Sequence, residues 1–323
     1  MFANEPALRF LDYPEQKCAD LLMQARWPGG FRCPGCGSTA HYRISGRRLP
    51  LFACASCRRQ CSLISGTVME RSRVPLRKWF TAIALISSRP ISAAALADQI
   101  RVTYKTAWLM LHKLRSAMSR HEDLDRLTGL VRLQLGNAGP RPLPWVRNLS
   151  DREHPFVIGG SMEGGPDGHV LGIKLMQDTG GDTYQWKITP QGALRFIEKH
   201  VDRSRSAVDL RTDTLGRTRV FSLWKIAMDI GCGINSVHRG VGAKYRQAYL
   251  NEYAYRFNQS SRGQNAERHL LHLAAASGAP TRKQLRARPV PGRPDWETYR
   301  NTRRMIAELK ALAARLLPQA SGQ

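Results

Sequence analysis

Apolar residues recur with helical spacing in three consecutive stretches between residues 74 and 118. The pattern predicts helices over about 75–87, 93–100 and 104–118. Pro75 falls in the first turn of the first helix, while Ser92 and Thr103 are placed to cap the second and the third. The apolar positions expected to face inward are Trp79, Phe80, Ile83, Ile86, Ala107, Leu111 and Leu114.

Shorter apolar runs separated by turn residues predict strands further along the chain. Strands are expected over about 130–136, 156–160 and 170–175, followed by a helix over 191–201 and a strand at 207–210. Residues 280–294 hold four prolines and several basic residues, which predicts a mobile linker before an amphipathic helix over about 296–317. This mixture predicts an α+β fold with several domains.

The charge of the chain indicates what kind of partner it binds. The 323 residues include 50 lysines and arginines against 25 acids, which gives a formal net charge of +25 and a pI of about 10.6. Such a charge favours a polyanionic partner, although the arginine bias of a GC-rich genome would produce the same excess. There is no apolar run long enough for a membrane span and no leader peptide at the N-terminus, so we expect a cytoplasmic, nucleoid-associated bacterial protein.

Four of the seven cysteines form a C-x2-C pair that repeats after 17 residues. This spacing is typical of a structural zinc site, in which two tight turns bring four thiolates to one tetrahedral ion. Two disulfides are the alternative, and they suit a secreted chain better than this one. Cys61 and His41 are nearby spare ligands, with Cys61 more simply a small buried residue. The predicted zinc ligands are Cys33, Cys36, Cys54 and Cys57.

The helices over 93–100 and 104–118 are joined by a tight turn, which is typical of a DNA-binding helix-turn-helix. An ordinary helical hairpin is the alternative. In a helix-turn-helix, the first residues of the second helix meet base edges and basic residues further along lie nearer phosphates. The candidates for base contact are Thr103, Tyr104, Lys105 and Thr106, and those for phosphate contact are Lys113 and Arg115.

Several segments of the chain resemble the ISXO-type group of bacterial insertion-sequence transposases. The similar segments are 26–37, 52–60, 64–67, 75–79, 105–108, 114–118 and 249–258. The resemblance implies a zinc ribbon and a helix-turn-helix followed by a ribonuclease-H-like domain with a mixed sheet. It also implies double-stranded DNA, the ends of an insertion sequence, as the partner. A homo-oligomer is compatible with the sequence.

The catalytic acids of this group are only partly present. Its chemistry uses two divalent metals, Mg²⁺ or Mn²⁺, held by carboxylates. Gln134 stands where the resemblance places the first aspartate, and Asp213 matches the second, although it is equally well a turn residue. No third acid matches, because Asp229 lies in an unrelated context before Gly231-Cys232-Gly233, which should end a helix.

The sequence therefore predicts a DNA-binding protein of the transposase family whose strand-transfer chemistry is weakened or lost. Two alternatives remain open: an active enzyme with unusual ligands, for which Glu163 and Asp182 are spare acids, or a domesticated DNA-binding regulator. Mg²⁺ or Mn²⁺ is expected only if the enzyme is active. The expected domains are a helix and zinc ribbon at 1–66, a helix-turn-helix region at 67–125, a catalytic-type domain at 126–279 and a basic C-terminal segment at 280–323.

Overall fold

The computed structural model divides the chain into two compact units. The first comprises Met1–Met118 with Asn265–Ala287, and the second comprises Ser119–Gln264 with Arg288–Gln323. The structure describes residues 6–44, 46, 48–138, 154–164, 168–178, 183–184, 187–210 and 220–288, with short helical pieces at 307–308, 311–312 and 315. Most of the predicted C-terminal helix lies outside the described residues.

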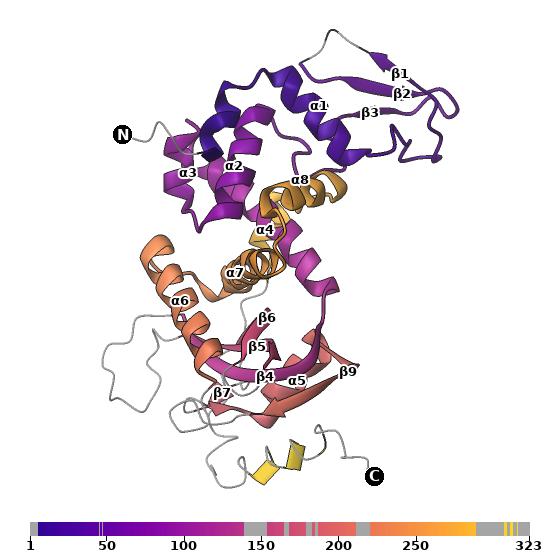
Figure 1. Cartoon of the computed structure of the whole chain (residues 1–323). Helices are drawn as coiled ribbons and strands as arrows, with labels where there is room; N and C mark the ends of the chain where they lie inside the picture. The colour runs from indigo at the N-terminus through magenta and orange to yellow at the C-terminus, as the bar shows by residue number, and fades with distance from the viewer. Residues whose placement is uncertain are drawn as a thin grey trace. The chain divides into compact units, whose positions relative to one another are not determined.

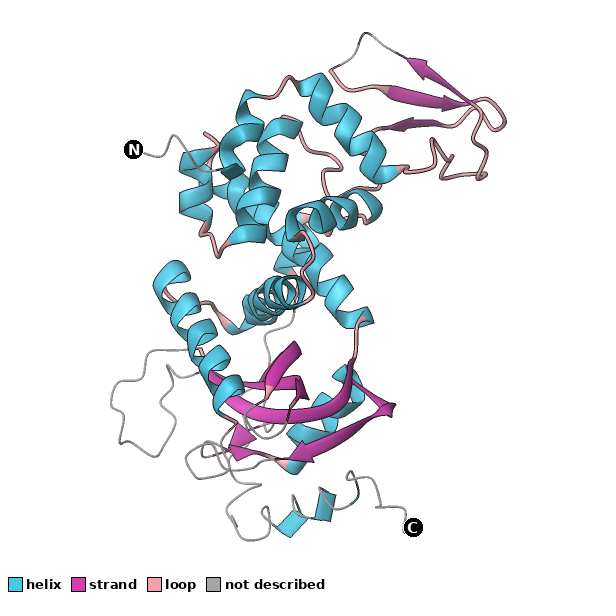
Figure 2. Cartoon of the chain, in the orientation of Figure 1, coloured by secondary structure: helices cyan, strands magenta, loops and turns pink. Residues whose placement is uncertain are grey.

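The first unit combines a small sheet with helices (Figures 1 and 2). Its sheet has the strand order β1-β2-β3, in which both pairs are antiparallel. The strands are β1 (His41–Ile44), β2 (Leu51–Cys54) and β3 (Gln60–Ser62). The helical elements are η1 (Pro6–Asp12), α1 (Glu15–Arg26), α2 (Leu76–Ser88), α3 (Ala93–Gln99), the start of α4 (Tyr104–Leu124), α8 (Ala266–Ala276) and α9 (Arg282–Arg286).

The three helices expected between residues 75 and 118 are present. Helix α2 is buried on nearly every side, and its N-terminus is capped from another helix because Pro75 has no side-chain acceptor. The Glu15 carboxylate accepts the Leu76 N–H at 2.7 Å, where the helix dipole also favours a negative charge. The Ser92 hydroxyl accepts the Ala95 N–H at 3.1 Å and caps α3 as predicted.

The compact units do not follow the boundaries expected at residues 66 and 279. Helix α8 belongs to the first unit, where the Val68 N–H donates to the Ala274 carbonyl at 2.8 Å and Arg9 pairs with Glu267 at 2.5 Å. A second difference is α9, which forms inside the predicted linker. The sequence Thr281-Arg-Lys-Gln284 makes a capping box, which starts a helix despite the prolines nearby.

The second unit is built on a four-stranded mixed sheet of order β6-β5-β4-β9. Strands β4, β5 and β6 are antiparallel neighbours, and β9 runs parallel to β4. The strands are β4 (Leu127–Asn137), β5 (Pro155–Glu163), β6 (His169–Gln177) and β9 (Val201–Leu210), and a separate pair is formed by β7 (Thr183–Tyr184) and β8 (Lys187–Ile188). All the strands expected from the apolar runs are therefore present.

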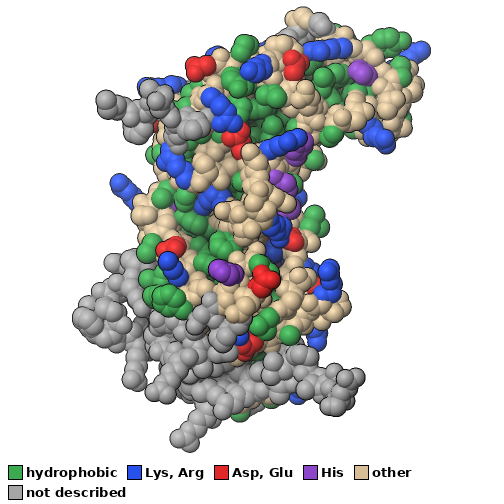
Figure 3. Space-filling view, viewed as in Figure 1, with side chains coloured by type: hydrophobic (Ala, Val, Ile, Leu, Met, Phe, Trp, Pro, Cys, Tyr) green, Lys and Arg blue, Asp and Glu red, His purple; other side chains and the backbone are tan. Residues whose placement is uncertain are grey.

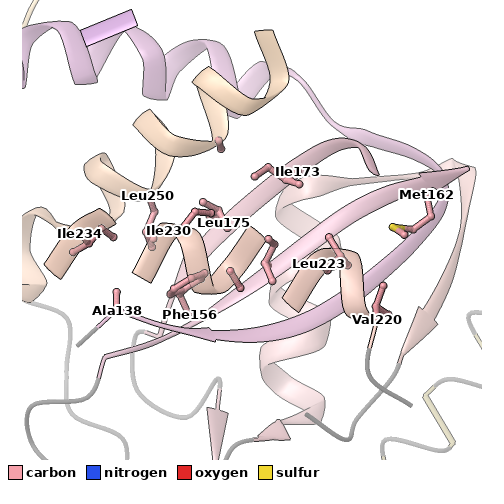
Figure 4. Close-up of a cluster of buried hydrophobic side chains, with 13 residues drawn as sticks. Ala138, Phe156, Met162, Ile173, Leu175, Val220, Leu223, Ile230, Ile234 and Leu250 are labelled. Carbon is pink, nitrogen blue, oxygen red and sulfur yellow. The ribbon is translucent and has the colours of Figure 1, made fainter. Parts of the chain in front are cut away.

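Each face of this sheet has its own apolar core. One core joins Leu133 and Val157 to Phe196 on α5 (Pro190–His200). The other joins Phe156 and Ile158 to Leu223 and other residues of α6 (Phe221–His238), with Leu250 and Ala254 of α7 (Ala243–Ser261), as Figure 4 shows in part. Because alternate residues of a strand face opposite sides, β4 contributes to both layers.

Helix α6 continues through Gly231-Cys232-Gly233, which corrects the expectation that this segment would end a helix. A Cβ on Gly231 would lie 2.2 Å from the Asn137 carbonyl oxygen, and one on Gly233 would lie 2.3 Å from the Tyr253 hydroxyl. The glycines therefore permit close packing against the end of β4 and against α7. Their cost to helix propensity is offset by this packing.

Helix α7 completes the hydrogen bonding of the edge strand β6 with side-chain amides. Asn258 accepts the Ile173 N–H through Oδ1 at 2.8 Å and donates to the Ile173 carbonyl at 3.0 Å. Gln247 accepts the Gln177 N–H at 2.8 Å and donates to the Leu175 carbonyl at 2.7 Å. These amides occupy the place of a fifth strand, so the edge does not expose unpaired backbone groups there.

Candidate metal centre and nucleic-acid interface

The two cysteine pairs fold as matching knuckles. In each, the N–H of the first cysteine donates to a carbonyl five residues on, from Cys33 to Ser38 at 2.9 Å and from Cys54 to Arg59 at 3.0 Å. In each, the residue four positions after that cysteine donates back to its carbonyl and has a positive φ, +76° at Gly37 and +57° at Arg58. This shared geometry turns both sulfurs of each pair toward one point.

The four sulfurs suit one tetrahedral zinc ion. The ligand atoms of Cys33, Cys36, Cys54 and Cys57 all lie within 4.8 Å of one another. Across the two knuckles, Cys33 Sγ is 3.6 Å from Cys57 Sγ, and Cys36 Sγ is 3.5 Å from Cys54 Sγ. Zinc–sulfur bonds of about 2.3 Å in a tetrahedron separate the sulfurs by roughly 3.8 Å, so little movement is needed to hold the ion.

Backbone groups favour the thiolate form of Cys33 and Cys54. The Gly35 N–H lies 3.4 Å from Cys33 Sγ, and this bond is the main reason that the pKa of Cys33 is lowered. The Cys57 N–H, with other backbone and side-chain groups, lowers the pKa of Cys54 to about 6. The neighbouring thiols of Cys54 and Cys57 instead raise the pKa of Cys36 to about 12. Since zinc binds the thiolate, Cys33 and Cys54 are favoured as ligands before the metal binds, whereas zinc must displace the proton of Cys36.

The spare ligands Cys61 and His41 lie outside this cluster of four. Cys61 is buried on β3, and burial raises the pKa of its thiol, as expected of a small apolar residue. The His41 ring packs 4.6 Å from the Phe31 ring, and its Nδ1 lies 2.9 Å from the Thr39 carbonyl. Four thiolates leave no open coordination position, so a zinc ion here would be structural.

The start of α4 is open to solvent. Thr103, Tyr104 and Lys105 are exposed, with Tyr104 at 58%, and Thr106 is partly exposed. The Thr103 hydroxyl accepts the Thr106 N–H at 3.3 Å, which caps the helix as predicted. Arg101, with a φ of +53°, ends the preceding turn, and its carbonyl accepts the Lys78 ammonium at 2.9 Å. The backbone of the turn is thus fixed while the side chains after it remain accessible.

Lys113 and Arg115 are not at the surface, which corrects their prediction as phosphate contacts. Arg115 is 1% exposed and Lys113 is 9% exposed. The Lys113 ammonium donates to the carbonyls of Val68 and Glu70, each at 3.0 Å, and burial lowers its pKa. Lys113 therefore stabilises the segment between the ribbon and α2.

The predicted catalytic face of the sheet carries an amide and an ion pair. Gln134 on β4 is 1% exposed, and neither polar atom of its side chain has a hydrogen-bond partner among the described residues. Two residues away on the same face, Arg132 binds the Asp209 carboxylate of β9 at 3.0 Å. An amide and an arginine do not suit a centre for two divalent cations, which requires several carboxylates.

The other proposed acids do not complete such a centre. Asp213 and Asp182 lie outside the described residues, so their places are not assigned. Glu163 lies five positions along β5 from Ile158, the residue paired with Gln134, which separates the two by roughly 16 Å. Asp229 is exposed on α6. Among the described residues, the structure therefore brings no carboxylate cluster to Gln134.

Two interactions at these sites were not predicted from the sequence. The pairing of Arg132 with Asp209 was indicated by an arginine inside an apolar strand, since such a residue needs a buried partner. The bonds of Arg26 to the carbonyls of Ser62 and Leu63, at 2.9 and 2.7 Å, had no sequence pattern to predict them. They tie the end of the ribbon sheet to α1.

Comparisons with known proteins agree with this metal centre. Residues 13–60 match the transposase zinc-ribbon domain. The chain is also 34% identical over 105 residues to an uncharacterised protein in the transposable element ISH50 of Halobacterium salinarum, a match that covers 32% of this chain and 36% of that protein. The chain thus matches little more than a third of that relative's length. No solved structure matches the chain.

One further finding concerns membranes. None of the helices in the described ranges has both the length and the apolar composition required to cross a bilayer. Figure 3 shows lysine and arginine side chains spread over one face of the molecule.

Proposed function

We propose that this protein binds double-stranded DNA in insertion-sequence transposition, or derives from a protein that did. The observation that carries the proposal is the four-cysteine centre within a segment that matches a transposase zinc ribbon. The net charge of +25 supports a polyanionic partner, and the exposed start of α4 supports a helix-turn-helix formed by α3 and α4. The natural target would be the ends of an insertion sequence.

In the proposed interface, Lys105 and the threonines beside it meet base edges while other basic residues meet phosphates. Selection of bound duplexes from a randomised pool tests the proposal, followed by Kd measurements for the best sequence and for a scrambled one. Lys105→Ala should weaken binding to the selected duplex and reduce its advantage over the scrambled one. Lys283→Ala, an exposed lysine in the same unit, is the matched control.

Failure to enrich any sequence would contradict specific recognition. An equal loss of affinity for both duplexes in Lys105→Ala would show that this residue contacts only phosphate. The full chain is required for these measurements because α8 packs in the first unit. A fragment ending near residue 125 would lack it and expose the surface that it covers.

The strand order β6-β5-β4-β9, with three antiparallel strands and a parallel fourth, supports the proposal that the second unit is a ribonuclease-H-like domain. Within it, Gln134 and the Arg132–Asp209 pair support the loss of metal-dependent strand transfer. A nicking assay on the selected duplex with Mg²⁺ or Mn²⁺ should yield no product. Nicking that Asp213→Ala abolishes would contradict this proposal and favour an active enzyme.

A further inference from the structure

The first unit contains an aromatic pocket that the proposed duplex interface does not use. It has a volume of about 590 Å³, within the range of about 300–1,000 Å³ typical of ligand sites. Residues of η1, α1, α2 and α8 line it, all within the same compact unit. The ribbon cysteines and the start of α4 are not among the lining residues.

Three aromatic rings are among the residues that line this pocket. The Phe10 ring is 5.3 Å from the Tyr13 ring and 5.5 Å from the Phe80 ring, and both pairs are edge-to-face. Phe10 and Phe80 are almost fully buried, whereas Tyr13 is only partly buried. Tyr13 is therefore the most accessible of the three rings, and Phe10, its edge-to-face neighbour, is itself packed against Phe80.

Basic side chains surround these rings. The Lys17 ammonium lies 3.8 Å from the centre of the Tyr13 ring, and the Arg9 guanidinium carbon lies 4.3 Å from the centre of the Phe10 ring. Arg268 adds a third cation, and Glu267 is the single acid of the lining. A ligand that joins a flat ring to a negative charge complements this arrangement.

We propose that the pocket holds an unpaired nucleotide of a DNA strand. The base would stack on Tyr13, and the adjoining phosphates would pair with Lys17 and Arg268. Insertion of the base displaces the Lys17 ammonium from the ring face, and an exposed cation–π contact is weaker than a base–aromatic stack. The inference rests on the proposed function, because it assigns a second kind of DNA contact to the same unit.

A nucleotide ligand would account for both the basic and the aromatic side chains in the lining of the pocket. A phosphate-binding surface alone needs no aromatic rings, and an apolar protein partner alone needs no cations. Stacking on an aromatic ring tolerates any base, so this site would hold an unpaired strand without reading its sequence. Sequence recognition would remain with the start of α4.

Two labelled single strands test the inference with the full chain at fixed salt. One is an oligothymidylate of about eight nucleotides, and the other has the same backbone with abasic sites in place of the bases. The wild-type protein should bind the oligothymidylate at least about 5-fold more tightly, since one stacked base contributes that much or more. Equal affinity for the two strands would overturn the proposal.

Variants then locate the site. Tyr13→Ala should remove the difference between the two strands, while Tyr13→Phe should keep it because the ring is retained. Tyr42→Ala is the matched control: this tyrosine of the same unit is 68% exposed on the ribbon, and its loss should leave the difference unchanged. Lys17→Ala should weaken the binding of both strands, because it removes a phosphate contact, and should not reduce the difference between them, because it also clears the ring face for the base.

The remaining outcomes separate this inference from its alternatives. If Tyr42→Ala removed the difference in affinity between the oligothymidylate and the abasic strand, and Tyr13→Ala kept it, the base would lie on the ribbon. That result would overturn the proposal. Concentration-dependent self-association that Tyr13→Ala abolishes, with oligonucleotide binding unchanged, would mean that the pocket holds a second copy of the chain. Lys105→Ala should leave the single-strand difference intact, so failure of duplex recognition and failure of the pocket give different results.

Discussion

The two residues with positive φ in the cysteine knuckles stand in equivalent places, but only one is a glycine. Gly37 adopts a φ of +76° at no steric cost, whereas Arg58 adopts +57° with a side chain attached. A non-glycine residue in this region loses roughly 1–2 kcal/mol. The second knuckle therefore holds strain that the first does not, and metal binding would have to compensate for it.

Arg58→Gly should stabilise the zinc-loaded ribbon by about 0.5–1 kcal/mol, because relief of the strain exceeds the extra entropy that glycine loses on folding. Gly37→Ala is the reciprocal variant and should destabilise by about 1 kcal/mol. No described atom lies within 4 Å of a Cβ built there, so only the backbone is strained. Denaturant unfolding of the zinc-loaded protein measures both, and a loss of stability in Arg58→Gly would refute the argument.

A buried histidine makes stability depend on pH. His200 is 4% exposed at the end of α5, and burial, with the charges of Lys199 and Lys174, lowers its pKa to about 3 from 6.5. The unfolded chain therefore binds a proton below pH 6.5 that the folded protein does not. Stability is fully present above pH 6.5 and falls by about 1.4 kcal/mol per pH unit below it, down to about pH 3.

His200→Gln removes this titration and keeps a neutral polar side chain. The difference in unfolding free energy between the variant and the wild type should change by about 2 kcal/mol in favour of the variant from pH 6.5 to pH 5. Denaturant unfolding at the two values measures it, and the comparison cancels groups that titrate in both proteins. Parallel pH profiles would contradict the lowered pKa, because they would show that His200 binds its proton equally well in the folded and the unfolded chain.

Helix α7 pairs with the edge of the sheet through polar side chains, a role that the spacing of its apolar residues does not predict. The amides of Gln247 and Asn258 lie three turns apart and pair with backbone groups of β6. Asn258 also donates to the Glu122 carboxylate, which lies 2.6 Å from the buried Lys174 ammonium. One helix thus covers a strand edge and completes a buried ion pair, which makes the edge unavailable to another strand.

Asn258→Ala should destabilise the protein by about 2–4 kcal/mol, because it leaves the N–H and carbonyl of Ile173 without these partners in a buried site and removes one of the bonds to the Glu122 carboxylate, which keeps Lys174. Gln259→Ala is the matched control. This amide is 0% exposed on the same helix, and its polar atoms have no partner among the described residues. Gln259→Ala removes more atoms, so a larger loss in Asn258→Ala can only reflect hydrogen bonds. Denaturant unfolding measures both.

The elements that the sequence predicted correctly are those with local causes. Helices α2, α3 and α5 follow from apolar spacing and from caps such as Ser92, and the zinc cluster follows from cysteine spacing. The errors depended on contacts distant in sequence. Gly231 is tolerated because it packs on Asn137, and Lys113 is buried because the segment near Val68 supplies acceptors. Neither neighbour is visible in a local pattern.

At the scale of the whole molecule, the cores belong to separate units. The cysteines lie in the first unit, whereas the sheet β6-β5-β4-β9 and its two apolar cores lie in the second. The bonds that zinc would make are confined to the first unit, where Arg26 joins the end of the ribbon to α1. Loss of the metal should therefore have a local effect.

Zinc analysis should give one ion per chain, and chelation should raise amide hydrogen exchange across residues 31–62. Without the ion, no bond joins the two knuckles, and the short strands have too small an apolar core to remain folded. Cys33→Ser should have the same effect. The contact of Trp27 with Phe52, 5.1 Å between ring centres, should also loosen.

The strands β4, β5, β6 and β9 provide the internal reference, because their protection should not change when zinc is removed. Duplex binding should weaken together with the loss of protection in the ribbon if the ribbon contributes to the interface. Full protection of residues 31–62 after complete removal of the metal would contradict a structural site. Exchange that rises equally in β4 and in the ribbon would instead show that the two units unfold together, and that zinc stabilises the entire chain.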